Sequence, residues 1–132
     1  MAASAIPQTP KPLVWIGRSL ADLKNFPDEV RSDIGHALHL AEQGAKNASA
    51  KPLKGFKGAG VLEIVEDFAG NTYRAVYAVR LAGRLYVLHA FQKKSKSGIA
   101  TPKSEIDLVH RRLKQAEAEH ADWLAAHTET DK

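Results

Sequence analysis

The chain has 132 residues, of which nineteen are Lys or Arg and fifteen are Asp or Glu, giving a formal charge of +4. This length suffices for one domain with its own hydrophobic core, and the absence of cysteine excludes a disulfide framework, a thiolate metal site and a cysteine nucleophile. The composition therefore predicts a single cytoplasmic domain whose mild positive charge suits nucleic acid, anionic lipid or an acidic protein as a partner.

Neither the N-terminus nor the interior indicates a targeting or membrane segment. Residues 1–12 are small, polar and interrupted by prolines, and they lack the charged start and apolar stretch of a secretory signal, so they predict a disordered arm. No apolar run is long enough to span a bilayer, and we expect no membrane partner. The predicted domain covers residues 13–127, and residues 128–132 are predicted to form a flexible tail.

A short strand and two helices are predicted in the first third of the chain. Residues 13–16 form a short apolar run between a proline and a glycine, which predicts a strand. Ser19 is predicted to cap a short helix that runs through Leu23. A second helix is expected to open at Pro27 and to close at Gly44, because apolar residues recur between them at helical spacing.

The middle of the chain is predicted to form a loop followed by a three-stranded antiparallel meander. Residues 45–60 are rich in Gly, Lys, Ala and Pro, and we interpret them as a basic loop and not a strand. Three runs of β-forming residues follow, separated by two short turn sequences that contain glycine. These runs cover residues 61–67, 72–81 and 84–91.

A second basic loop and a long helix complete the chain. The loop covers residues 92–100, after which Thr101 is predicted as the N-cap and Pro102 as the first helical residue. One face of the helix carries the apolar residues Ile106, Val109, Leu113, Ala116 and Trp123. The order β-α-α-β-β-β-α predicts an α+β fold, in which the meander and the N-terminal strand form a small antiparallel sheet flanked by the helical pair and the C-terminal helix.

The basic residues gather at places that a meander can bring together. They precede the meander, lie in or beside its central hairpin, or follow its last strand: Lys51, Lys54, Lys57, Arg74, Arg80, Arg84, Lys93, Lys94 and Lys96. Such a cluster can hold the phosphates of single-stranded RNA. Four aromatic residues of the meander are available to stack on bases: Tyr73, Tyr77, Tyr86 and Phe91. We assign RNA contacts to Lys57, Lys96 and Tyr73; the alternative is that the cations only solvate a small domain.

Arg74 has two interpretations that its position leaves open. It lies near the start of the second predicted meander strand, and its guanidinium is suited to binding a phosphate through two hydrogen bonds. It can equally form a surface ion pair with Glu63 or Glu66 on the neighbouring strand. The spacing of these residues favours neither interpretation over the other.

His89 and the other histidines give little indication of a catalytic or metal site. His89 can act as an acid or a base in RNA cleavage. Strict alternation places it on one face of its strand with Leu85, Val87 and Phe91, which favours a hydrogen-bonded core histidine. The remaining histidines show no metal-ligand spacing, and no glycine-rich loop leads into a helix, so we expect no metal and no nucleotide cofactor.

Four motifs follow one another between Pro52 and Ala116. They are LKG at 53–55, TYRAVY at 72–77, LHAFQKKS at 88–95 and TPxxEI at 101–106. Together they closely resemble the phage-derived Gp49-like proteins, a HigB-like branch of the RelE/ParE toxin superfamily. The resemblance is continuous over about half of the chain, and the preceding strand and helical pair fit the same fold.

The resemblance implies a compact antiparallel sheet flanked by helices, in a toxin encoded beside a helix-turn-helix antitoxin that neutralises it. It further implies a ribosome-dependent endoribonuclease that cuts messenger RNA in the A site without a metal or cofactor. Matched by motif, Arg74 and Lys93 or Lys94 fall at positions that bind the phosphate and stabilise the transition state. Lys54 of the LKG motif is implied as a further RNA contact.

One segment departs from the pattern of RelE-type enzymes. Where those enzymes place lysines, this chain has LEIVED at 62–67, so the general base is unassigned, with Glu63 and Glu66 as candidates. No tyrosine near the C-terminus replaces the one that RelE uses. The departure favours an alternative function as a non-catalytic binder, either a ParE-like topoisomerase inhibitor or a degenerate toxin that only binds an antitoxin. A DNA-binding regulator ranks last, because no recognition helix is evident.

Overall fold

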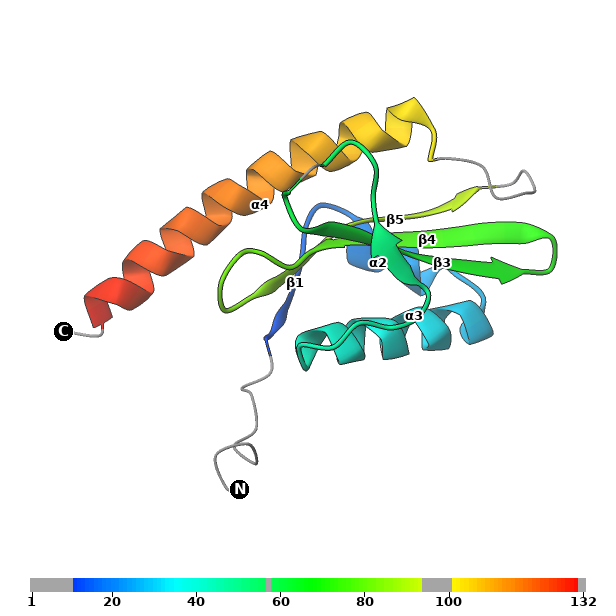
Figure 1. Ribbon diagram of the computed structural model, residues 1–132, viewed down its shortest axis with the longest axis horizontal. Helices are drawn as coiled ribbons and strands as arrows, with labels where there is room; N and C mark the ends of the chain where they lie inside the picture. The colour runs from blue at the N-terminus through cyan, green and yellow to red at the C-terminus, as the bar shows by residue number, and fades with distance from the viewer. Residues whose placement is uncertain (1–10, 57, 94–100, 131–132) are drawn as a thin grey trace, which may run out of the picture.

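The computed structural model describes residues 11–56, 58–93 and 101–130. Within them the chain forms a sheet with helices on both sides (Figure 1). The elements are β1 (Leu13–Trp15), α2 (Ser19–Lys24), α3 (Asp28–Glu42), β2 (Ala50–Pro52), β3 (Val61–Phe68), β4 (Asn71–Ala78), β5 (Leu85–Lys93) and α4 (Lys103–Thr130). The predicted α+β class is confirmed.

The strands form one sheet in the order β1-β5-β4-β3-β2. The meander β3-β4-β5 is antiparallel throughout, as predicted from its three runs and two turns. The sheet is mixed and not wholly antiparallel, because β1 runs parallel to β5, with Leu13 beside Leu85. The backbone hydrogen bonds fix this direction: Leu85 donates to the carbonyl of Pro12 at 3.0 Å, and Ile16 donates to β5 further along.

The segment 45–60, predicted as a loop without a strand, contains β2. Ala50 pairs with Ile64 and Pro52 with Leu62, both antiparallel. The prediction is wrong here because β3 offers an edge of backbone donors and acceptors that three residues can pair with whatever their own strand propensity. A proline is tolerated in such an edge strand.

Each face of the sheet is covered by a different part of the chain. α2 and α3 lie against one face, and α4 crosses the other (Figure 1). The core on the α3 side includes Leu23, Val30, Ile34, Leu38, Ile64, Tyr73, Tyr77 and Val87. The core on the α4 side includes Ile16, Val76, Tyr86, Leu88, Phe91, Val109, Leu113 and Ala116. The predicted apolar face of the long helix is therefore the face that α4 buries.

A β-bulge changes the phase of β5. Tyr77 pairs with Val87 but the preceding Val76 pairs with His89, so β5 contains one extra residue, Leu88, between two consecutive residues of β4. Before the bulge, Val87 faces the α3 side, whereas Leu88 and Phe91 belong to the α4 side. The predicted strict alternation is thus wrong, because the extra residue turns His89 and Phe91 to the face opposite Leu85 and Val87.

Two predicted helix caps are also wrong. Ser19 is the first residue of α2, and its hydroxyl donates to a backbone carbonyl of β5 at 3.2 Å and caps nothing. α4 begins at Lys103, and the carbonyl of Pro102 accepts the first helical hydrogen bonds. Pro102 therefore stands at the N-cap, and the hydroxyl of Thr101 is used in a contact with the sheet.

The predicted disordered arm, residues 1–12, lies outside the described residues except for its last two. Of these, Lys11 is fixed by a backbone hydrogen bond to Glu42 at 3.0 Å. At the other end, α4 continues to Thr130, beyond the predicted domain boundary at 127, and residues 131–132 lie outside the described residues. Residues 57 and 94–100, which include three of the predicted RNA-binding or catalytic lysines, lie outside them as well.

Candidate functional site

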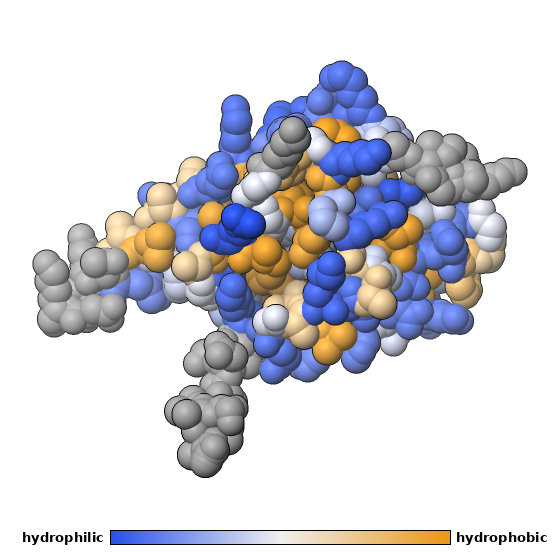
Figure 2. Space-filling view, in the orientation of Figure 1, coloured by the Kyte–Doolittle hydropathy of each residue, from blue (hydrophilic) through white to orange (hydrophobic). Residues whose placement is uncertain are grey.

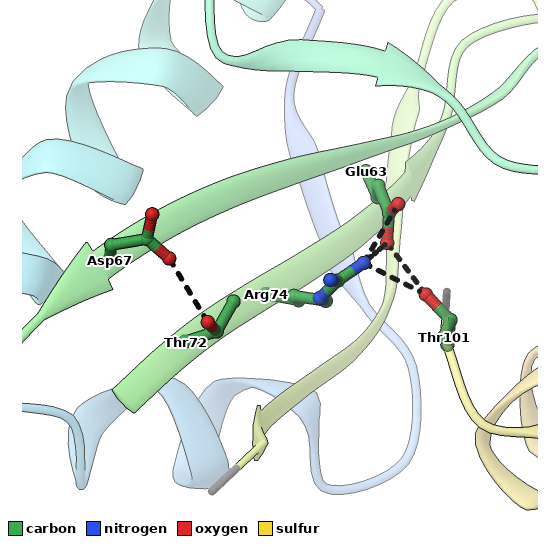
Figure 3. Close-up of polar contacts among 5 residues, drawn as sticks. All are labelled: Glu63, Asp67, Thr72, Arg74 and Thr101. Carbon is green, nitrogen blue, oxygen red and sulfur yellow. Dashed lines mark hydrogen bonds and ion pairs between the residues drawn. The ribbon is translucent and has the colours of Figure 1, made fainter. Parts of the chain in front are cut away.

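A buried ion pair lies on the α4 side of the sheet. Nη1 of Arg74 is 3.1 Å from both carboxylate oxygens of Glu63 and 3.1 Å from Oγ1 of Thr101 (Figure 3). The hydroxyl of Thr101 donates in turn to Oε2 of Glu63 at 3.0 Å. The side chains of Arg74 and Glu63 are only 4% and 6% exposed. The three residues therefore form a closed, charge-neutral triangle that ties two strands to the segment before α4.

The strand register explains how this triangle forms. Arg74 pairs with Val65 and Glu63 pairs with Val76, so Arg74 and Glu63 are diagonal neighbours on one face of β3 and β4. Of the two interpretations of Arg74, the structure shows an ion pair with Glu63, and the pair is buried and not at the surface. Figure 3 shows a second polar contact near the outer end of the same strands, between Thr72 and Asp67 at 3.0 Å.

A second polar cluster joins β5 to α4. Nε2 of His89 lies 2.6 Å from Oε1 of Glu105, and Nδ1 of the same ring lies 3.3 Å from Nη1 of Arg112. Because a guanidinium can only donate hydrogen bonds, Nδ1 accepts from Arg112 and the ring proton is on Nε2. His89 therefore donates to Glu105. The prediction of a hydrogen-bonded core histidine is consistent with this arrangement.

The turn after β1 supports this second cluster. Gly17 has a φ of +59°, and a Cβ built there would lie 2.9 Å from Nε of Arg112. The side chain of Arg112 thus passes directly over the backbone of Gly17, and it also donates to the carbonyl of Leu88 at 3.0 Å. A glycine at this position allows both the left-handed turn and the close approach.

The two clusters are neighbours across β4 and β5. Phe91 pairs with Arg74 in the sheet, and its ring stacks on the ring of His89 with 4.8 Å between centroids. Thr101 of the first cluster lies one helical turn before Glu105 of the second. The face beneath the N-terminal half of α4 therefore carries a nearly continuous band of polar and ionisable groups.

Of the predicted catalytic residues, Arg74 and Lys93 are brought to the same face of the sheet. Lys93 pairs with Thr72, which is two residues from Arg74 along β4, and both lie beyond the bulge in the same phase as Phe91. Lys94 lies outside the described residues. Lys93 is the last residue of β5.

The predicted RNA-binding residues lie in several places. Lys54 is exposed in the loop after β2, and this loop is held on α4 by the ring of Phe56, which stacks on His110 at 4.1 Å. Tyr73 faces the α3 side, where its ring is buried against Phe26 at 4.9 Å, so the structure does not bring it together with Arg74. The other two, Lys57 and Lys96, lie outside the described residues.

The two carboxylates proposed as general bases face opposite sides of the sheet. Glu63 is on the α4 side within the buried triangle, whereas Glu66 pairs with Tyr73 on the α3 side. Burial, followed by the neighbouring carboxylate of Asp33, raises the pKa of Glu66 above its usual value of 4.5. Only Glu63 is therefore near Arg74, and its carboxylate is taken up by Arg74 and Thr101.

A third cluster lies toward the C-terminal end of α4. The hydroxyl of Tyr86 is 3.0 Å from Nδ1 of His120, and the guanidinium of Arg84 lies 4.9 Å above the ring of Trp123. Burial, with a smaller contribution from the charge of Arg84, lowers the pKa of His120 below its usual 6.5. This cluster fastens the distal part of α4 to the turn between β4 and β5.

The described surface offers no indication of a metal or membrane site. Within residues 11–56, 58–93 and 101–130, no three His, Asp or Glu side chains are placed to hold a metal ion. In the same segments no helix has the length and apolar character needed to cross a membrane.

Figure 2 shows hydrophilic side chains interspersed with apolar patches on one face of the molecule. Among the described residues, the exposed large apolar side chain is that of Leu124 on α4, which is 42% exposed.

Sequence reasoning missed Glu105 and Arg112 as partners of His89. The TPxxEI motif contains Glu105, but the motif marks a helix start and says nothing about which strand the helix crosses. The β-bulge at Leu88 turns His89 toward Glu105 and Arg112. A prediction that assumes strict alternation along the strand has no place for such a bulge. The glycine at position 17 leaves room for the side chain of Arg112, but the two residues are far apart in the sequence and only the fold brings them together.

The family model described as phage derived protein Gp49-like matches residues 21–114. The matched segment contains all six residues of the first two clusters: Glu63, Arg74, His89, Thr101, Glu105 and Arg112. The solved structure of a mutant of the E. coli toxin RelE in the free state is similar to this chain, with 19% sequence identity and a TM-score of 0.46, over 61% of this chain and 81% of that one. No curated protein matches the sequence.

Proposed function

The chain belongs to the phage-derived Gp49-like family, and from this premise we propose that it is the toxin of a toxin–antitoxin pair that cuts messenger RNA on the ribosome without a metal ion. The observation that carries the proposal is the placement of Arg74 and Lys93 on one face of the sheet, where Arg74 is also bonded to Thr101 just before α4. This is the arrangement of cations that a phosphodiester in a single-stranded segment requires.

The proposed chemistry is attack of a ribose 2′-hydroxyl on the adjacent phosphate. The crowded phosphate gains negative charge in the transition state, and Arg74, Lys93 and Lys94 stabilise that charge. Lys54, on the loop held by Phe56 and His110, contacts the RNA backbone beyond the cleaved bond, and we assign the same role to Lys57 and Lys96. Tyr73 is left out of this surface, because its ring is buried on the α3 side.

A second candidate function is favoured by one observation, the buried pair of Arg74 and Glu63. An arginine whose charge is neutralised at 3.1 Å by a buried carboxylate contributes less to binding of a phosphate. In this alternative the chain is a non-catalytic binder, either an inhibitor of a topoisomerase or a degenerate toxin. Both candidates include a helix-turn-helix antitoxin as the binding partner.

The test is cleavage of a defined messenger on translating ribosomes by purified, antitoxin-free protein, with new 5′ ends mapped by primer extension. Lys93→Ala and Arg74→Lys are compared with Lys24→Ala, which removes a cation from α2. Arg74→Lys keeps the charge that Glu63 requires and removes the planar guanidinium. We expect cuts at A-site codons that decrease strongly in the first two variants and persist in the third. An intact messenger after exposure to folded wild-type protein would favour the binder.

A further inference from the structure

The proposed reaction needs a group that takes a proton from the 2′-hydroxyl, and a side chain in its cationic form cannot do so. An arginine stays protonated in proteins, and a lysine ammonium has no lone pair to accept a proton. The described α4 face carries three carboxylates on or beside the sheet, Glu63, Asp67 and Glu105. The side chain of Glu63 is 6% exposed and is held by Arg74 and Thr101, whereas that of Glu105 is 30% exposed. Glu105 is therefore more accessible than Glu63, and it differs from Asp67, which accepts a hydrogen bond from Thr72 at 3.0 Å, in being oriented by a histidine.

The second polar cluster holds Glu105 in a fixed orientation. Arg112 donates to Nδ1 of His89 at 3.3 Å, so Nε2–H of His89 points at Oε1 of Glu105, 2.6 Å away. His89 thus donates to the carboxylate of Glu105, and this hydrogen bond orients the carboxylate and stabilises its charged form, which is the form that can accept a proton.

We propose that Glu105 is the general base of the cleavage, and that His89 and Arg112 are residues that position it; this inference rests on the proposed function. The proton of the 2′-hydroxyl moves to the carboxylate of Glu105 as the 2′-oxygen forms a bond to phosphorus. The bond from phosphorus to the 5′-oxygen breaks, and that oxygen leaves with the electron pair and takes a proton from water. Glu105 returns its proton to the hydroxide that remains, so protons balance over one cycle.

The first test is the single-turnover rate of messenger cleavage on programmed ribosomes between about pH 5 and 9, with Glu105→Gln as the variant. A positioned acid–base group contributes at least about 100-fold in rate, so the variant is expected to lose that factor and the acid-side fall of the rate profile. The matched control is Asp107→Asn, an exposed carboxylate two residues further along α4 that pairs with Lys103 at 3.0 Å. The control is expected to cut at the wild-type rate.

The second test separates positioning from structure at His89. A glutamine carries an amide nitrogen near the place of Nε2 and can donate to Glu105, whereas a leucine cannot. We expect His89→Gln to keep most of the rate and the wild-type pH profile. His89→Leu is expected to shift the acid-side fall to higher pH, because the carboxylate of Glu105 loses a donor that favours its charged form. An identical pH profile in all three proteins would overturn the positioning role.

The outcomes distinguish failure of this inference from failure of the proposed function. If folded wild-type protein leaves the messenger intact, both are overturned. If the wild-type protein cuts and Glu105→Gln cuts equally fast, only the inference on Glu105 is overturned. Thermal unfolding is recorded for each variant; should Glu105→Gln not fold, the wild-type rate profile decides, because a rate that does not fall toward acid pH contradicts a carboxylate base.

Discussion

Arg74 and Glu63 form an ion pair in which one nitrogen, Nη1, lies 3.1 Å from both carboxylate oxygens, with both side chains more than nine-tenths buried. Removing two charges from water is costly, and the pair offsets that cost only while both partners and the hydroxyl of Thr101 are in place. The pair is therefore expected to contribute to the stability of the α4 side.

Replacing Glu63 with Gln is expected to lower the free energy of unfolding by about 3 kcal/mol, because the buried guanidinium of Arg74 loses the carboxylate that pairs with it. Urea unfolding followed by circular dichroism measures the change. The double variant Glu63→Gln with Arg74→Met removes both charges and is expected to recover most of the loss. A single variant as stable as the wild type would show that the pair is solvated in solution.

Replacing Gly17 with Ala is expected to destabilise the protein by more than the same change at Gly44. Both glycines have a positive φ, of +59° and +87°, which costs an alanine about 1 kcal/mol or more. At Gly44 nothing lies within 4 Å of the added Cβ, whereas at Gly17 it meets the guanidinium of Arg112 at 2.9 Å. The difference between the two melting temperatures isolates the displacement of Arg112, and equal losses would contradict the close approach.

Replacing Glu66 with Gln is expected to stabilise the protein at neutral pH by up to about 1 kcal/mol. Burial and the charge of Asp33 raise the pKa of Glu66, so the folded state binds this proton more tightly than the unfolded chain does. Stability is therefore lost as pH rises from the usual 4.5 through the raised pKa. Melting temperatures at pH 4 and pH 7 should show a gain for the variant at pH 7 that shrinks at pH 4. Asp67→Asn, on the same strand, is the comparison.

Replacing His120 with Asn is expected to flatten the acid side of the stability profile. Burial lowers the pKa of His120 below 6.5, so the stability of the neutral form is complete above that value and is lost as pH falls through the lowered pKa. An asparagine can still form a hydrogen bond with Tyr86 but does not titrate. Melting temperatures between pH 5 and 8 measure the slope. His36→Asn, at an exposed position of α3, should retain the wild-type slope.

Much of the fold could be predicted from local patterns in the sequence. The meander follows from β-forming runs separated by glycine-containing turns, and α3 and α4 follow from helical spacing of apolar residues. β2 could not be predicted in this way, because Ala50–Pro52 becomes a strand only through pairing with β3. The parallel direction of β1 likewise depends on a partner, β5, that lies far away in the sequence.

The candidate site was less accessible to sequence reasoning. Cross-strand spacing offered an ion pair of Arg74 with Glu63 or Glu66 as one of two interpretations, but the burial of Arg74 depends on α4 and on Thr101, which no spacing within the strands reveals. His89 was assigned to the wrong face, because a single extra residue at Leu88 changes the phase of everything after it. Glu105 can be identified as the partner of His89 only when two things are known: which face of β5 carries His89, and where α4 crosses that face.

The pairing of β1 with β5 has a consequence for how the protein is made. Synthesis delivers β1 first, but its hydrogen-bonding partner β5 is the last of the described strands to leave the ribosome, so the sheet cannot be completed until β5 has emerged. His89 and Leu88, which receive the donors of Arg112, belong to that same late strand. The nascent protein therefore lacks its full sheet until β5 has emerged, and it lacks its second polar cluster until Arg112 on α4 has followed.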